Sequence, residues 1–217
     1  MAPRRKPIGR LHVLTDVELQ TRFSHVELTR LAIDGGADTV QFRQKTGSTR
    51  ALIETAREMG QLCARAGVTF LVNDRVDVAI AADADGVHLG QSDFPIPLAR
   101  RLLGPGRIVG GSASTVDEAK QCEAEGADYV GFGPVYPTTS KADAAPAGGL
   151  DLLLRVVEAV ACPVVAIGGI GEGNAAAVLR AGALGIAVIS AVCCRDDPAQ
   201  AARGLARVLA GAGGSRG

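Results

Sequence analysis

The sequence has little of what several functional classes require. Only 3% of the 217 residues are aromatic and none is tryptophan, which disfavours the base-stacking platforms of proteins that bind single-stranded nucleic acids. Basic and acidic residues both number 23, so net charge gives no reason to expect nucleic acid or membrane partners. No stretch approaches the roughly 20 apolar residues of a membrane span, and the apolar stretch after the basic N-terminus is too short for a signal peptide. We therefore expect small-molecule partners; the oligomeric state stays open, a homo-oligomer included.

Cysteine and histidine are few and scattered. The five cysteines form no metal-type C-x-x-C pair, their number is odd, and adjacent Cys193 and Cys194 are poorly placed to bridge each other. Reduced thiols in a cytoplasmic protein are the simplest interpretation. The three histidines do not cluster. His88 lies within a predicted strand, and we expect it to be an interior residue with its hydrogen bonds made, not a catalytic base. The sequence thus offers no zinc ligand set and no Ser-His-Asp arrangement.

What the sequence does contain is an alternation of short apolar runs and helical patterns. The runs are rich in Val, Ile and Leu without strict alternation, which is typical of buried parallel strands. Eight such units predict a single-domain α/β fold, the TIM (β/α)8 barrel, over 10–210, with flexible ends at 1–9 and 211–217. A doubly wound open sheet is the main rival, but it would want a G-x-G-x-x-G turn after the first strand, and VLTDVE offers none. The predicted strands and their exit loops fall in 10–15, 38–45, 69–74, 86–93, 107–114, 128–141, 163–170 and 184–192.

Four joints between a helix and the next strand look alike: DGGADTV, AADADGV, AEGADYV and RAGALGI. Such self-similarity marks a repeated structural unit, and a glycine at this position closes a helix. Ser48 or Thr49 is expected to cap the helix that Gly67 ends, and Thr115 with Glu118 has the spacing of a capping box.

Two predicted neighbouring strands end in a carboxylate, Asp74 and Asp93. In a barrel the active site lies at these carboxyl ends. Neighbouring parallel strands lie roughly 4.8 Å apart, so the two side chains could share one cation. Mg²⁺ suits one or two carboxylates together with substrate phosphates. The alternative is that each aspartate caps the helix that follows it.

Polar and cationic side chains gather at other strand ends. Period-two alternation places Gln41, Arg43 and Lys45 on one face and Phe42 on the other. Placing three such side chains in a barrel mouth costs folding free energy unless they bind an anion. A loop in which Arg43 and Lys45 are simply solvated is the alternative. The fifth strand ends in a Gly-Gly-Ser sequence at Ser112, which suits either a phosphate contact or a helix cap.

The remaining strand ends are rich in hydroxyls and glycines. The long loop after the sixth strand carries Thr138, Ser140 and Lys141, which suit a phosphorylated substrate and a closing lid; a loop without function is the alternative. The seventh and eighth strands end in Gly-Gly-Ile and Ile-Ser, and barrels often bind phosphate there through backbone N–H groups. These ends contain Gly169, Ile189 and Ser190. Two anion sites and one cation site argue for two phosphorylated substrates, one of them a diphosphate whose departure a metal assists.

Five segments together resemble the thiamine phosphate synthase family: VQFRQK, NDRVDVA, DGVHLGQSD, GADYVGFGPVYPTTSK and VVAIGGI, in order within residues 10–192. The pairing of NDR with DGVHLGQSD is highly specific, whereas many phosphate-binding barrels have GGI. The resemblance implies a transferase that joins a hydroxymethylpyrimidine diphosphate to a thiazole carboxylate phosphate and yields thiamine phosphate, diphosphate and carbon dioxide. It also implies Mg²⁺ as cofactor and a dissociative reaction, in which diphosphate leaves before the thiazole nitrogen attacks.

The resemblance assigns roles to strand-end residues by the group that each would contact. The Mg²⁺ ligands would be Asp74 and Asp93. The residues that bind the pyrimidine diphosphate would be Gln41, Arg43, Lys45, Asn73, Ser112 and Lys141. Within this set, the catalytic residues would be Arg43, Lys45, Ser112 and Lys141. The residues that bind the thiazole substrate would be Thr138, Ser140, Gly169, Ile189 and Ser190.

The chain departs from the family pattern at three places. Ser114 stands where the family often has a histidine, Ser140 stands in place of a threonine, and GIGEGN replaces the more usual Gly-Ile-Thr-x-x-Asn start of the seventh helix. None of these changes removes a charged group. They therefore bear on the rate of the reaction more than on the resemblance to the family. A thiazole tautomerase would want the histidine that Ser114 replaces. The other rivals are a non-catalytic thiamine-phosphate-binding barrel and a phosphosugar isomerase, which would want a Glu or Cys base at a strand end.

Overall fold

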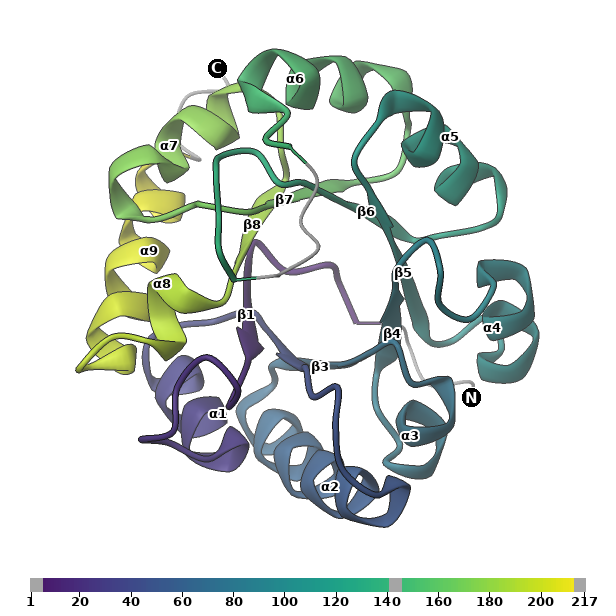
Figure 1. Cartoon of the computed structure of the whole chain (residues 1–217), viewed down its shortest axis with the longest axis vertical. Coiled ribbons are helices and arrows are strands. Elements are labelled where there is room, and N and C mark those ends of the chain that lie inside the picture. Colours follow the sequence, from purple (N-terminus) through teal and green to yellow (C-terminus); the bar gives the residue numbers. More distant parts are fainter. Residues whose placement is uncertain (1–5, 141–145, 213–217) are drawn as a thin grey trace.

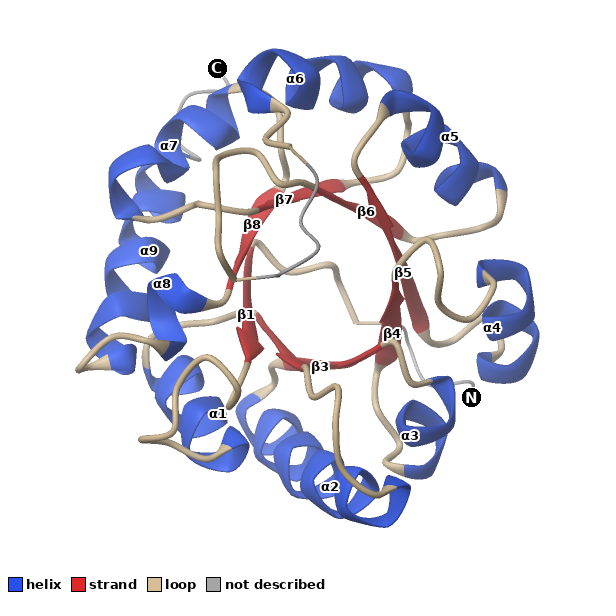
Figure 2. Ribbon diagram, viewed as in Figure 1, coloured by secondary structure: helices blue, strands red, loops and turns tan. Residues whose placement is uncertain are grey.

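The computed structural model describes residues 6–140 and 146–212; Lys141, one of the predicted site residues, lies outside them, as do 1–5 and 213–217. Within the described residues, eight parallel strands close into a barrel in sequence order, and the last strand pairs with the first. Figures 1 and 2 show the helices as a ring around these strands. The predicted TIM barrel is confirmed. The strands are β1 (Leu11–Thr15), β2 (Thr39–Phe42), β3 (Thr69–Asn73), β4 (Gly86–Leu89), β5 (Ile108–Ala113), β6 (Tyr129–Phe132), β7 (Val164–Ile167) and β8 (Gly185–Val188).

Among the described residues, one helix follows each of the first seven strands and two helices follow β8; their buried apolar residues pack against the sheet. The helices are α1 (His25–Asp34), α2 (Thr49–Ala66), α3 (Val76–Ala81), α4 (Ile96–Leu103), α5 (Val116–Ala124), α6 (Gly149–Ala159), α7 (Glu172–Arg180), α8 (Ser190–Cys193) and α9 (Pro198–Ala212). The eighth strand is shorter than predicted, because the chain leaves the sheet after Val188 and forms the short helix α8.

Helix ends follow local side-chain chemistry. Ser48 caps α2 by accepting a hydrogen bond from the Ala51 N–H, and Gly67 ends it in the left-handed conformation. Thr115 caps α5 in the same way, but the predicted capping box is only half formed. The Glu118 carboxylate accepts from the N–H and hydroxyl of Ser114, at 2.6 and 2.8 Å, instead of closing onto Thr115.

The repeated joints have a common structural role. The aspartate of the first joint, Asp38, accepts hydrogen bonds from the N–H groups of Arg10 and Leu11 at the start of β1. Asp85 and Asp128, at the corresponding positions, accept from N–H groups near the start of the preceding strands, Phe70 at 2.8 Å and Val109 at 2.7 Å. These carboxylates satisfy strand N–H groups at the floor of the barrel, which explains why the G-A-D pattern repeats.

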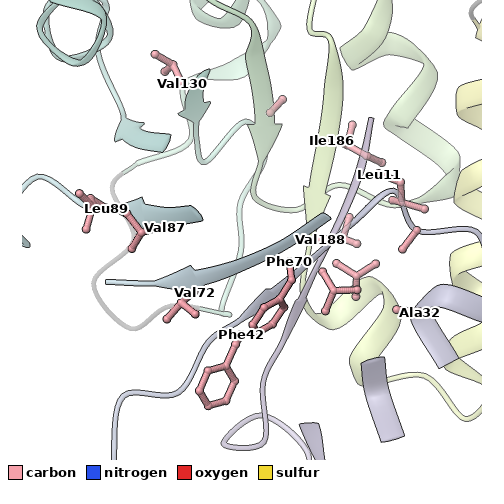
Figure 3. Close-up of a cluster of buried hydrophobic side chains, with 14 of the residues drawn as sticks. Leu11, Ala32, Phe42, Phe70, Val72, Val87, Leu89, Val130, Ile186 and Val188 are labelled. Carbon is pink, nitrogen blue, oxygen red and sulfur yellow. The ribbon is translucent and has the colours of Figure 1, made fainter. Parts of the chain in front are cut away.

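Two apolar layers hold the fold. The larger layer lies between the strands and the helices, and Figure 3 shows part of it, with Phe42 and Phe70 reaching outward from neighbouring strands. The smaller layer fills the barrel and comprises Leu14, Leu71, Ile108, Tyr129, Val165, Ala187 and Ile189. Because this interior is packed with side chains, open space for a ligand must lie at a rim of the barrel.

The N-terminal residues that the structure describes are packed, although the sequence favoured a flexible segment up to residue 9. Lys6 donates to the Val68 carbonyl at 2.9 Å and pairs with Asp85 at 2.8 Å. Ile8 packs against the interior layer from the floor. All five cysteines are free thiols, as expected. No helix in the described part of the chain is long and apolar enough to cross a membrane.

Candidate active site

A cavity of about 800 Å³ opens at the carboxyl ends of the strands. Its walls come from the ends of β3 to β8, from Lys45 in the loop after β2 and from the loop that follows β6. Most of the predicted site residues line it: Lys45, Asn73, Asp74, Asp93, Ser112, Thr138, Ser140, Gly169, Ile189 and Ser190. The predicted strand-end residues are thus brought to one place, with Gln41 and Arg43 as the exceptions among the described residues.

The carboxylates of Asp74 and Asp93 lie within hydrogen-bonding distance of each other, and Lys45 Nζ contacts Asp74. Burial raises the pKa of Asp74, and its hydrogen bond with Asp93 raises it further, while Lys45 opposes the shift. For Asp93, burial acts against the charged form, but the bonds from Asp74 and the Gly90 N–H outweigh it and lower the pKa. Two carboxylates this close repel each other when both are ionised, and a cation between them removes that repulsion. The pair therefore fits a divalent cation.

Neither aspartate caps a helix. The N-cap residue of α3 is Arg75, without a side-chain cap bond, and the N-cap residue of α4 is Pro95. Asp93 instead accepts from the Gly90 N–H at 2.7 Å, within its own loop. The alternative interpretation of Asp74 and Asp93 as helix caps is therefore wrong.

No group of three or more His, Cys, Asp or Glu side chains in 6–140 and 146–212 is arranged to hold a metal ion. A metal site built on Asp74 and Asp93 would need further oxygen ligands from substrate phosphates and water. Mg²⁺ is the cation that binds in this way.

Arg43 and Gln41 are buried next to the cavity instead of lining it. Gln41 is aligned with Leu14 and Leu71 of the neighbouring strands and so belongs to the inward row, while Phe42 faces the helices, as the alternation predicts. Arg43 forms an ion pair with Asp16, the residue directly after β1. Their relative exposures are only 9% and 1%, so Arg43 is not simply solvated. Asp16 was not among the predicted site residues, although its place just after a strand resembles that of Asp74.

On the other side of the cavity, the loop after β6 reaches the start of α8. The Ser140 hydroxyl donates to the Ser190 hydroxyl at 3.1 Å, and Thr138 Oγ1 accepts from the Ser140 N–H at 3.2 Å. Gly169 has a φ of +63°, and a Cβ there would lie 2.6 Å from the Pro137 carbonyl oxygen. Only glycine lets the turn after β7 pass this closely under the loop. The predicted thiazole-side residues therefore form one wall of hydroxyls and open backbone.

A family model described as thiamine monophosphate synthase matches residues 11–192, which include every described element from β1 to the start of α8. The chain belongs to the thiamine monophosphate synthase family.

Relatives in this family are close in sequence and length. The thiamine-phosphate synthase of Salinibacter ruber is 55% identical over 196 residues, which are 90% of this chain and 86% of that protein. The one from Methanocella arvoryzae is 54% identical over 92% of this chain and 94% of its own length. Thiamine-phosphate synthases are transferases, and the chain is an enzyme of that class.

Solved structures agree with this assignment. Thiamine phosphate pyrophosphorylase from Pyrococcus furiosus superposes with a TM-score of 0.86 at 43% identity, over 94% of this chain and 96% of that one. A 3-hexulose-6-phosphate synthase superposes with a TM-score of 0.70 at 21% identity. The second likeness shows only that the barrel is shared.

The cavity of this thiamine monophosphate synthase family member also has lining residues that the sequence did not single out. They include Gln91, Glu118, Cys194 and Arg195. Gln91 follows Gly90 at the end of the fourth unit and donates to the Ser112 carbonyl at 2.6 Å. Its place within DGVHLGQSD could have marked it. Glu118 had been assigned only to a helix cap, and nothing in the local sequence marks Cys194 or Arg195.

Proposed function

We propose that the cavity joins a hydroxymethylpyrimidine diphosphate to a thiazole (carboxylate) phosphate and forms thiamine phosphate, diphosphate and carbon dioxide. The observation that carries this proposal is that one cavity has two different walls, one that suits a diphosphate together with a metal ion and one that suits a phosphate. Asp74, Asp93 and Lys45 stand on one side, and the Ser140–Ser190 contact stands on the other. Two phosphorylated substrates can therefore meet with their reacting carbon and nitrogen between the walls.

The diphosphate belongs on the side of the carboxylate pair. Lys45, Asn73 and Ser112 line that part of the cavity and offer one ammonium group, one amide and one hydroxyl. We assign Gln41, Arg43 and Lys141 to the same substrate. When bound by Asp74 and Asp93, Mg²⁺ would supply positive charge to the oxygens of the departing diphosphate.

The thiazole phosphate belongs on the opposite wall. Thr138, Ser140 and Ser190 offer hydroxyls there, and Gly169 and Ile189 offer backbone. A phosphate group suits such a wall because hydroxyl and N–H donors bind its oxygens without a fixed counter-charge.

The reaction needs no protein nucleophile. The bond between the pyrimidine methylene carbon and its oxygen breaks, and its electron pair leaves with diphosphate. The resulting cation is stabilised by the amino group of the pyrimidine, and the thiazole nitrogen attacks it. The bond between the thiazole and its carboxylate then breaks, carbon dioxide leaves, and the electron pair of that bond stays with the thiazole, which takes up a proton. The protein supplies positioning and charge: Lys45 and Ser112 hold the leaving oxygens, and the loop after β6 limits the access of water.

The rival functions find no support in the site. A tautomerase would want an imidazole after β5, but Ser114 stands there, and both its N–H and its hydroxyl are bound to Glu118. A binding protein without catalysis would have no need for the close pair of carboxylates that Asp74 and Asp93 form.

The direct test mixes the purified protein with both phosphorylated substrates and follows thiamine phosphate by mass spectrometry. Product should form with Mg²⁺ and disappear with EDTA. Failure to form product in the presence of Mg²⁺ would refute the proposed reaction.

The metal assignment is tested by Asp74→Asn and Asp93→Asn, each of which should lower turnover by about 100-fold because the leaving charge loses its counter-ion. Asp77→Asn is the matched control, since Asp77 lies on α3, pairs with Arg75 and does not line the cavity. Circular dichroism should show the same fold in all three variants. Turnover near that of the wild type in both Asp74→Asn and Asp93→Asn would remove the proposed metal site.

A further inference from the structure

Behind the diphosphate side of the cavity, three side chains form a hydrogen-bonded row that crosses β4, β5 and β6. The Tyr129 hydroxyl lies 2.9 Å from His88 Nδ1, and His88 Nε2 lies 2.9 Å from Ser112 Oγ. Ser112 lines the cavity, whereas His88 and Tyr129 do not. The row therefore leads from the closed interior of the barrel to a residue that faces the substrate.

The barrel leaves room for this row by means of two glycines. A Cβ on Gly110 would lie 2.4 Å from the Tyr129 ring and 2.6 Å from His88 Nδ1. A Cβ on Gly131 would lie 2.7 Å from His88 Cε1. The rings of His88 and Tyr129 stack with their centroids 5.4 Å apart. Any larger residue at these positions on β5 and β6 would push the imidazole away from Ser112.

The direction of the protons in this row follows from burial. Tyr129 is only 1% exposed, and burial raises the pKa of its phenol, so the hydroxyl keeps its proton. His88 Nδ1 is the hydrogen-bond partner of that hydroxyl among the described residues. A buried O–H without an acceptor costs free energy, so Nδ1 accepts the hydrogen bond that the phenol donates. A neutral imidazole has one donor and one acceptor, and Nε2 then carries the hydrogen and donates to Ser112 Oγ.

A serine hydroxyl that accepts on one side turns its own proton to another side. We propose that Tyr129 and His88 are positioning residues that turn the Ser112 proton into the cavity, toward an oxygen of the diphosphate substrate. The proposal rests on the proposed function for the identity of that substrate. Without the row, the Ser112 hydroxyl could rotate and donate to Nε2, and the substrate would lose a fixed donor. A donor that is oriented before the reaction has no reorganisation cost when charge develops on the leaving oxygen.

The proton direction itself is tested by ¹⁵N NMR of the imidazole nitrogens in the wild-type protein. The chain has three histidines, so His88 can be assigned by comparison with a His88→Gln variant. We expect the neutral His88 ring to carry its hydrogen on Nε2. A ring with its hydrogen on Nδ1 would overturn the proposal. This measurement needs no activity, so it stays informative even if the proposed reaction fails.

The effect on catalysis is tested by a double-mutant cycle. Tyr129→Phe removes only the hydroxyl and should lower kcat by about tenfold, the effect of one misdirected hydrogen bond, with an unchanged KM for the thiazole phosphate. Ser112→Ala should lower kcat at least as much. Tyr129→Phe should have no further effect in the Ser112→Ala background, because it acts through Ser112.

The control is Thr39→Val, which removes a buried barrel hydroxyl that has no hydrogen-bond partner among the described residues. It should leave kcat unchanged. Losses from Tyr129→Phe and Ser112→Ala that simply multiply would overturn the proposal, because they would show that Tyr129 acts through packing alone. If Tyr129→Phe does not fold, the wild-type NMR measurement decides.

Discussion

Neutralising Asp16 tests how the fold holds Arg43. The two side chains form an ion pair and are 1% and 9% exposed. Asp16→Asn keeps the shape of the side chain and the oxygen that accepts from the N–H groups of Glu18 and Leu19 at 2.9 and 3.0 Å. The substitution therefore keeps the loop contacts, removes the charge and replaces the oxygen that accepts from Arg43 with an NH2 group. Removing one partner of a buried ion pair costs about 3–5 kcal/mol, because the other charge stays buried and unpaired. Since Arg43 keeps slight access to solvent, we expect a loss of about 3 kcal/mol in the free energy of unfolding.

Urea unfolding of the wild type, Asp16→Asn and the double variant Asp16→Asn/Arg43→Met measures this loss. The double variant should regain most of the lost free energy, because the unpaired charge is gone. Its turnover should nevertheless stay low, because Arg43 is proposed to bind the diphosphate. A loss below about 1 kcal/mol in Asp16→Asn, the range of exposed ion pairs, would refute the view that the pair is buried from water.

Three further predictions concern stability and substrate binding. Burial lowers the pKa of His12 from 6.5 to about 4, so the unfolded chain binds a proton that the folded chain does not, and stability should fall as pH drops from about 6.5 to about 4. Urea midpoints should show this slope in the wild type; His12→Gln should make it shallower, and the rest should come from His25, whose pKa burial also lowers to about 4. Asp85→Ala leaves the Phe70 N–H without its acceptor and Lys6 without its ion-pair partner; it should cost about 2 kcal/mol in urea unfolding, and an unchanged midpoint would contradict the role of the joints. Ser140→Ala breaks the contact with the Ser190 hydroxyl and should raise the KM for the thiazole phosphate by about fivefold at unchanged kcat; initial rates at varied thiazole concentration check this, and an unaltered KM would remove Ser140 from that site.

The fold could be predicted from the sequence because its signals are local. Apolar runs of strand length, caps such as Ser48 and stops such as Gly67 act within a few residues, and each agreed with the observed element. The start of α8 was missed because Ile189 is as compatible with a strand as with the residue before a helix. Glu118 was misassigned because two acceptable donors lie close to it, and only the geometry of the turn selects Ser114.

The sequence could predict the members of the site only where a position at a strand end is enough to bring a residue to the cavity. Parallel strands of a barrel bring their carboxyl ends together, so Lys45 and the two aspartates had to meet near one rim. The position of Arg43 depends instead on which partner its long side chain reaches. The sequence offered a bound anion or solvent as partners and did not indicate Asp16, which only the packed structure selects.

Asp74 combines two features that cost folding free energy. It is one of two non-glycine residues with positive φ in the described part of the chain, at +65°, and the other is Asp83 at +54°. Asp83 occupies a helix-to-strand joint where the other repeats use glycine, so its conformation has a structural cause. Asp74 has no such cause: it follows β3 directly, and its carboxylate lies against that of Asp93, where burial and repulsion raise its pKa. Glycine would relieve the backbone and the charge together, at a gain of about 1 kcal/mol or more. Among the described residues, the contact with Lys45 is the one charge that favours an ionised Asp74 in the folded chain alone, and we propose that a cation bound between the two carboxylates offsets the remaining cost.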